Sequence, residues 1–364
     1  MNSKEIILSQ LNCKPTEIQP YDVSFEPKLY KKLTEFYGDE KWEEKKLRKF
    51  LKCCFGVDTM MSTPVPNVVN DKAHYLNSLH PGIEKYNDNI YGIDAYGSIW
   101  RNDRNIMHQE VPALTEPTFE NYRFPDAEMF IKNVDHGKAD ALKFCRDEKD
   151  SFITIYIGWG IFERTWCMRG FENAMMDMLT EEKFYTELCE KITDLYIEFI
   201  RYVADVNADA ILLGDDWGDQ RGVIMGKDLW LKYFKPCYER IYDEIHKQDK
   251  KIIQHCCGSI VDIYDDLAEI GMDCHESVQP ESANMAPELV KAGWGDKICF
   301  LGCLGSQSTL FTGTPDGIRT EILRLRDLFK PDGGYILAPA KSLSDEMDIE
   351  QAVAVIETLS TLND

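Results

Sequence analysis

Residues 250–258 read Lys-Lys-Ile-Ile-Gln-His-Cys-Cys-Gly, an apolar run of strand character that ends in a histidine, two cysteines and a glycine. A helical pattern follows at once, with apolar residues every three or four positions from Ile260 to Ile270. In α/β folds, ligands bind at the carboxyl ends of the strands. His255 and Cys257 lie two residues apart, so on an extended backbone their side chains point the same way. An imidazole and a thiolate aimed at one point supply half of a zinc site.

Similar strand-then-helix units surround this segment. Further apolar runs end in glycine, small or polar residues at 152–158, 208–213, 272–278, 297–301 and 335–337. Helical patterns separate them, the clearest at 180–203, 227–248 and 348–359. Alternation of this kind predicts parallel strands covered by helices. We therefore expect an α/β fold, a (β/α)₈ TIM-type barrel whose first two strands are not evident from the sequence.

The amino-terminal third lacks this alternation. Residues 1–60 read as a polar helical extension, and residues 61–125 are rich in Pro, Asn, Gly and Asp. Within the second stretch, residues 91–100 predict a short hairpin. No linker stands out as a boundary, so we expect one domain over residues 1–364.

Composition excludes several classes of partner. The 364 residues carry a formal charge of −22, which disfavours nucleic acid and anionic membrane surfaces. No apolar run reaches the roughly 20 residues of a membrane span, and the first residues lack a signal-peptide pattern. In such a chain, the 12 cysteines are expected to be reduced thiols. A cytoplasmic location is the resulting expectation, and the sequence is compatible with a homo-oligomer.

The strand ends gather the residues that could carry chemistry. If the barrel forms, its mouth receives Trp159, Asp215, Asp216, His255, Cys257, His275, Glu276, Cys303 and Lys341. Most have a structural alternative: the aspartate pair could cap a helix, and a single cysteine is usually a small buried apolar residue. Cys303 differs because it ends a strand between glycines, where a ligand can approach the backbone closely.

From about Trp159 to the carboxyl terminus, the chain resembles the uroporphyrinogen decarboxylase superfamily. The motifs are Gly-Asp-Asp-Trp-Gly-Asp-Gln at 214–220, Phe-Lys-Pro at 234–236, His-Cys-Cys-Gly at 255–258, Val-Gln-Pro-Glu at 278–281 and Gly-Gly-Tyr-Ile-Leu-Ala-Pro at 333–339. The resemblance implies a (β/α)₈ barrel. The arginine-rich amino-terminal signature of the true decarboxylases is missing, because the nearest stretch, Ile99-Trp100-Arg101, does not match it. The motifs instead resemble the cobalamin-dependent methyltransferase branch, which implies transfer of a methyl group from a methoxylated aromatic to the Co(I) of a separate corrinoid protein.

The same branch binds zinc through His-x-Cys and a distant cysteine. Here the position expected for that cysteine holds Lys341. We expect His255, Cys257 and a substitute, Cys303, as metal ligands, with His275, Glu276 and the aspartate pair as further candidates. Asp215 or Asp216 would donate a proton to the leaving group, or Lys341 would stabilise it as a cation. Residues expected to contact the substrate are Trp159, Trp217, Gln279 and Tyr335.

Three other functions remain open. The first reverses the direction of transfer, from a corrinoid protein to a thiol, although the missing third cysteine argues against it. The second is a non-catalytic protein that docks to a corrinoid partner, with Lys341 marking a dead site. Porphyrinogen decarboxylation is the third.

Overall fold

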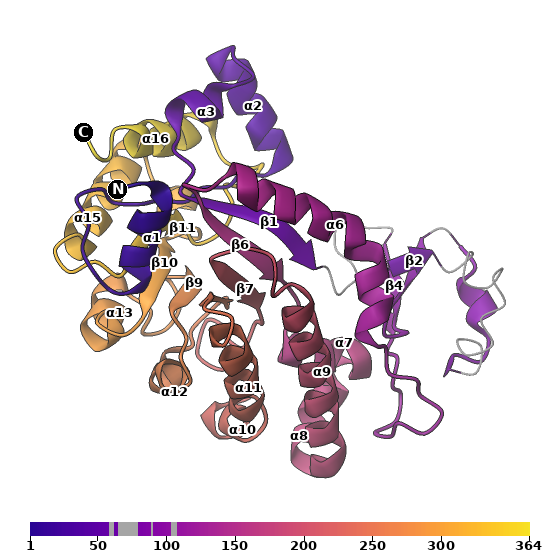
Figure 1. The fold of residues 1–364 in the computed structure, drawn as a ribbon. Coiled ribbons are helices and arrows are strands. Elements are labelled where there is room, and N and C mark those ends of the chain that lie inside the picture. Colours follow the sequence, from indigo (N-terminus) through magenta and orange to yellow (C-terminus); the bar gives the residue numbers. More distant parts are fainter. Residues whose placement is uncertain (58–61, 65–78, 89, 103–107) are drawn as a thin grey trace.

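A curled sheet of seven parallel strands forms the centre of the molecule (Figure 1). The computed structural model describes residues 1–57, 62–64, 79–88, 90–102 and 108–364. In spatial order the strands are β1 (Leu51–Val57), β6 (Phe152–Ile157), β7 (Ala210–Gly214), β8 (Lys251–His255), β9 (Cys274–Val278), β10 (Cys299–Leu304) and β11 (Tyr335–Pro339). Because this order follows the chain and all the pairings are parallel, the carboxyl ends of the strands lie at one edge.

Helices return the chain between these strands and cover the outer face of the sheet, as Figure 1 shows. The long crossovers are α6 (Ala127–Asp147), α9 (Glu182–Tyr202), α11 (Lys235–His246) and α15 (Pro315–Phe329). Shorter helices are α7 (Ile161–Arg169), α8 (Phe171–Thr180), α10 (Lys227–Tyr233), α12 (Tyr264–Glu269), α13 (Pro287–Trp294), α14 (Thr309–Thr312) and the carboxyl-terminal α16 (Ile349–Ser360). The helix expected over 227–248 is divided into α10 and α11 where Lys235-Pro236 begins a new first turn. None of the helices in the described ranges combines the length and apolar composition that a bilayer crossing requires.

The amino-terminal segment contains more than the expected helices. It forms α1 (Ser3–Leu11), α2 (Pro27–Tyr37) and α3 (Trp42–Lys46), but residues 51–57 form strand β1 at the edge of the sheet. This corrects the expectation of helix up to residue 60. The extended residues between α1 and α2 also bridge β11 in parallel, at Tyr21–Leu337 and Phe25–Leu343. They extend the curled sheet of the TIM-type fold beyond β11.

The interior is filled by side chains from the strands and the inner faces of the helices. In β6 and β7, Ile153, Ile155 and Ile211 are buried, and α9 buries an apolar face that includes Leu188 and Ile192. Fully burying a side chain of this size stabilises the fold by roughly 1.5–3 kcal/mol. The strand ends are thereby held on a rigid base.

A second, antiparallel sheet lies beside α7. Its strands are β2 (Ser62–Pro64), β3 (Tyr91–Asp94), β4 (Ile99–Arg101) and β5 (His108–Val111), and pairing of β3 with β4 confirms the expected hairpin. The buried Asp94 carboxylate accepts hydrogen bonds from the turn and from Trp100 Nε1 at 2.8 Å. It also lies 3.9 Å from the buried guanidinium of Arg164 in α7. This ion pair joins the small sheet to the helix that follows β6.

Candidate functional site

Three potential metal ligands converge at the carboxyl ends of β7 and β8. Nε2 of His255 lies 3.6 Å from Sγ of Cys257 and 3.6 Å from Oδ1 of Asp216. The three ligand atoms all lie within 4.8 Å of one another. Asp216 Oδ1 also accepts a hydrogen bond from the backbone N–H of Cys257 at 2.8 Å, which fixes the carboxylate beside the thiol.

Glu276 orients the imidazole from the neighbouring strand β9. Its Oε2 lies 2.5 Å from Nδ1 of His255, so the other ring nitrogen faces Asp216 and Cys257. Burial alone would lower the pKa of His255, but the charges and hydrogen bonds of Glu276 and Cys257 raise it well above its usual value. A carboxylate behind a ligating histidine is the arrangement that fixes ring orientation in zinc sites.

The donor set fits zinc. Tetrahedral zinc with its usual bond lengths holds nitrogen, sulfur and oxygen ligand atoms about 3.3–3.6 Å apart. The separations of 3.6 Å from His255 Nε2 agree with this geometry. Three protein ligands with a fourth position free is the pattern of catalytic rather than structural zinc sites.

Two adjacent residue pairs divide their roles in the same way. In Asp215-Asp216 and in Cys256-Cys257, the first residue is buried in the core and the second reaches the cluster. The turn after β8 is held by Gln279, whose side-chain oxygen accepts a hydrogen bond from the N–H of Gly258 at 2.7 Å. Gln279 is itself buried, so it supports this turn from behind.

Asp215 holds the beginning of α7. Its carboxylate accepts hydrogen bonds from the backbone N–H groups of Phe162 and Glu163, from Trp217 Nε1 and from the hydroxyl of Tyr238. Burial raises its pKa to about 6, although these four donors favour the charged form. The structure thus gives Asp215 the capping role that was the alternative to proton donation.

Glu163 is a titratable residue that the sequence reasoning missed. It lies in the first turn of α7, partly buried, and burial followed by the charges of Asp215 and Asp216 raises its pKa to about 8. A carboxyl group in this state carries a proton near neutral pH. The available signal is the strand end at Gly158-Trp159-Gly160, because α7 begins directly after it at Ile161.

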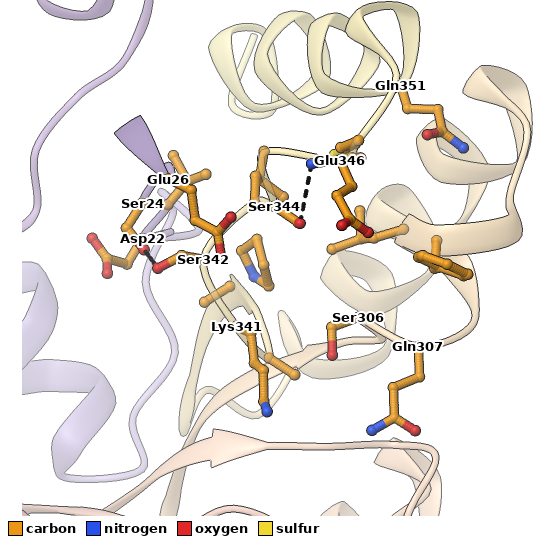
Figure 2. A pocket seen from close by; sticks show the side chains of 18 of the residues that line it. Asp22, Ser24, Glu26, Ser306, Gln307, Lys341, Ser342, Ser344, Glu346 and Gln351 are labelled. Carbon is orange, nitrogen blue, oxygen red and sulfur yellow. Dashed lines mark hydrogen bonds between the residues drawn. The ribbon is translucent and has the colours of Figure 1, made fainter. Parts of the chain in front are cut away.

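A cavity of about 830 Å³ opens beside the cluster. His255, Cys257 and Glu276 contribute to its wall, and the loop from β11 to α16 supplies Lys341 and the residues that follow it. Figure 2 shows the amino-terminal segment that contains Asp22, Ser24 and Glu26 beside this loop, where Ser24 Oγ lies 2.7 Å from Ser342 Oγ. A volume of this size suits a small organic ligand.

The structure does not bring Cys303 to the cluster. Its side chain is fully buried, its φ is 68°, and burial raises the pKa of its thiol. The charges that act most on this thiol are those of Arg324 and Glu321 in α15 and Glu288 in α13, and Cys303 is absent from the group formed by Asp216, His255 and Cys257. Asp216, rather than the expected Cys303, lies together with His255 and Cys257.

Most of the expected aromatic contacts also lie away from the cavity. Trp217 is fully buried against Trp230 and Tyr238, with ring centroids 5.5 and 4.8 Å away. Tyr335 is fully buried and stacks on Phe329 at 4.0 Å.

Two other residues from the strand ends belong to the surrounding framework. Trp159 is partly buried and packs edge-on against Trp166 at 6.1 Å. His275 is buried, where Nδ1 lies 2.7 Å from the hydroxyl of Tyr264 and Nε2 lies 3.0 Å from the carbonyl oxygen of Cys256.

A curled parallel sheet with an imidazole, a thiol and a carboxylate at its carboxyl edge defines a TIM-type protein with a candidate metal site. The chain belongs to the uroporphyrinogen decarboxylase (URO-D) family, whose profile matches residues 106–362. It is 27% identical over 142 residues to a uroporphyrinogen decarboxylase of Bacillus cereus (strain B4264), a match covering 35% of this chain and 39% of that protein. A uroporphyrinogen decarboxylase of Bacillus thuringiensis (strain Al Hakam) matches at 26% identity with the same coverage. The chain thus spans about two-fifths of the length of these curated relatives.

A solved structure described as a methyltransferase has the same fold. A methyltransferase from Methanosarcina mazei superimposes with a TM-score of 0.65 over 100% of both chains, at 15% sequence identity. This likeness confirms the barrel architecture expected from the sequence. The family and this structural neighbour are enzymes.

Proposed function

We propose that this protein transfers a methyl group from a methylated small molecule, a methoxylated aromatic in the first instance, to the Co(I) of a partner corrinoid protein. The observation that carries the proposal is the cluster of His255, Cys257 and Asp216, oriented by Glu276, beside a cavity of ligand size. The similarity of the chain's fold to that of a methyltransferase is consistent with this function.

The negative charge that develops on the leaving oxygen must be stabilised. Attack of Co(I) on the methyl carbon forms a cobalt–carbon bond, breaks the carbon–oxygen bond and leaves a phenolate that needs a proton or a positive charge. Zinc held by His255, Cys257 and Asp216 would supply a Lewis acid for that oxygen.

Two residues of the chain can manage the developing charge. Glu163 holds a proton near the cluster at neutral pH, because burial and the aspartates raise its pKa to about 8. Lys341 lines the cavity and offers a cation to the phenolate. In this mechanism Asp215 acts by holding the start of α7, and with it Glu163, in place.

The charge of the cavity argues against porphyrinogen decarboxylation. Five carboxylate side chains line it, and among its described lining residues Lys341 is the single lysine or arginine. A substrate with several carboxylates would be repelled there. Methyl transfer from a corrinoid protein to a thiol would use the same zinc ligands, with the thiol as the acceptor. This alternative differs from the proposal in the direction in which the methyl group moves.

An anaerobic assay with Co(I) cobalamin as acceptor tests the proposal. Zinc-loaded protein should form methylcobalamin with at least one donor from a panel of methoxyarenes, methylamines and thioethers. His255→Ala and Asp216→Ala should each lose the activity, whereas Glu35→Gln on the exposed face of α2 should retain it. Failure with every donor by zinc-loaded protein would refute methyl transfer to Co(I), and thiol-dependent loss of methylcobalamin would favour the reverse direction.

A further inference from the structure

An uncovered aromatic side chain lines the cavity beside the cluster. Phe311 belongs to α14, the short helix that follows β10, and its exposed fraction of 69% is the highest among the large apolar side chains of the described ranges. Within the part of the lining that the structure describes, it is the single phenylalanine, tyrosine or tryptophan. Trp159, Trp217 and Tyr335, the substrate contacts expected from the sequence, do not line this cavity. Phe311 is therefore the aromatic ring that the cavity offers to a ligand.

The backbone on both sides of Phe311 is held by hydrogen bonds. Before α14, Glu281 Oε1 accepts hydrogen bonds from the backbone N–H groups of residues 307 and 308, at 2.8 and 2.9 Å. After α14, the side chain of Gln351, labelled in Figure 2, donates a hydrogen bond to the carbonyl oxygen of Gly313 at 2.6 Å. The protein thus fixes the helix that carries Phe311 at both ends while leaving the ring itself uncovered.

The neighbours of Phe311 in the lining include buried apolar side chains. Leu310 comes from α14, and Leu343 and Met347 come from the loop between β11 and α16. Leu310 is 6% exposed, so it anchors α14 to the core, whereas the next residue, Phe311, is left open to solvent. A ring placed against Phe311 would remove apolar surface of both partners from water, and paired aromatic rings attract each other beyond this burial.

The same cavity reaches the cluster. His255 and Cys257 line it together with Phe311, and its volume of about 830 Å³ lies within the range of sites that hold small molecules. A methoxylated arene has an apolar ring and a methoxy oxygen at its edge. One cavity therefore offers an aromatic contact to the first and the candidate metal ligands to the second.

We infer that Phe311 is a specificity-determining residue, which packs against the ring of an aromatic methyl donor and so selects aromatic over saturated methyl ethers. That the bound arene is the methyl donor rests on the proposed function. The substrate class is thereby narrowed to aromatic ethers, and one side chain is assigned to their recognition. Phe311 binds the ring and takes no part in breaking the carbon–oxygen bond.

Calorimetry with two neutral alcohols of similar size tests the inference. Para-methoxybenzyl alcohol is compared with trans-4-methoxycyclohexylmethanol on the full-length zinc-loaded protein. The saturated analogue has at least as much apolar surface, so burial alone gives no preference for the arene. We expect the arene to bind roughly fivefold more tightly, because the contact between aromatic rings adds to burial.

Variants assign the preference to one side chain. Phe311→Leu keeps an apolar contact and should lose most of the preference for the arene, whereas Phe311→Tyr should retain it. Phe311→Ala should weaken the binding of both alcohols. Phe36→Ala is the matched control, because Phe36 is an exposed phenylalanine of α2 that does not line the cavity. Since Phe311 is mostly exposed, its variants should fold like the wild type.

Equal affinities of the two alcohols would overturn the inference, as would a preference that survives in Phe311→Leu. It would also be wrong if neither alcohol bound, or if Phe311→Ala bound both as tightly as Phe36→Ala does. The measurement needs no corrinoid, so arene binding without methyl transfer would refute the proposed reaction alone. Methyl transfer from an amine without any arene binding would refute the role of Phe311 and leave transfer to Co(I) intact.

Discussion

Glu276 and His255 lie on adjacent parallel strands, and the carboxylate oxygen of one is 2.5 Å from Nδ1 of the other. The contact leaves Nε2 as the ring nitrogen that faces Cys257 and Asp216. The geometry of the candidate metal site therefore depends on a residue that need not touch the metal.

Replacing Glu276 by Gln should weaken zinc binding about 10–100-fold, because the neutral amide orients the ring less firmly and makes it less basic. Competition with a chelator of known affinity measures the change. Glu35→Gln serves as the matched control on a distant surface. An unchanged affinity in Glu276→Gln would mean that the ring is held by its surroundings alone.

Cobalt(II) in place of zinc should reveal one thiolate ligand. We expect a sulfur-to-cobalt charge-transfer band that is lost in Cys257→Ser and retained in Cys303→Ser, because Cys303 is fully buried and does not belong to the group of His255, Cys257 and Asp216. Asp216→Asn should alter the ligand-field bands while keeping the charge-transfer band. If the band disappears in Cys303→Ser, that cysteine is a ligand after all.

Asp215 should contribute to stability rather than to metal binding. Its carboxylate accepts four hydrogen bonds, so Asp215→Asn turns an amide N–H₂ toward donors and should lower the free energy of unfolding by about 1–3 kcal/mol. Urea unfolding of metal-free protein measures this. The neighbouring Asp216→Asn is the control, and equal losses in the two variants would contradict the division of roles.

Glu163 should make stability depend on pH. Its pKa is raised from 4.5 to about 8 in the folded protein, so the folded state binds this proton more tightly than the unfolded state. The resulting stabilisation is complete below about pH 4.5 and is lost as the pH rises toward 8. In metal-free protein, Glu163→Gln should therefore gain stability relative to the wild type between pH 5 and pH 8, by more than about 1 kcal/mol. A parallel pH dependence of the two proteins would show that Glu163 titrates normally.

The sequence predicts the barrel well where strands are apolar runs with small or polar ends, as in β6 to β11. It does not reveal β1, since two cysteines and a glycine within residues 51–57 conceal the strand pattern. The bridge between Tyr21 and Leu337 joins residues far apart in the chain, and no local pattern predicts it.

For the site, the two-residue spacing correctly brings His255 and Cys257 together. Strand periodicity does not give the direction of Cys303, because positive φ angles at Gly302 (132°) and at Cys303 itself (68°) interrupt the alternation of side chains along β10. Asp216 is one of several candidate metal ligands in the sequence, and the fold shows that its carboxylate lies beside His255 and Cys257.

The paired residues Asp215-Asp216 and Cys256-Cys257 also affect how relatives should be compared. Because each pair repeats one residue type, an alignment shifted by one position still matches aspartate with aspartate and cysteine with cysteine. Identity at these positions would look intact while the buried member and the member at the cluster were exchanged. Transfer of residue roles between members of the family should therefore be anchored on His255 and Gly258, which flank the cysteine pair and have no identical neighbour.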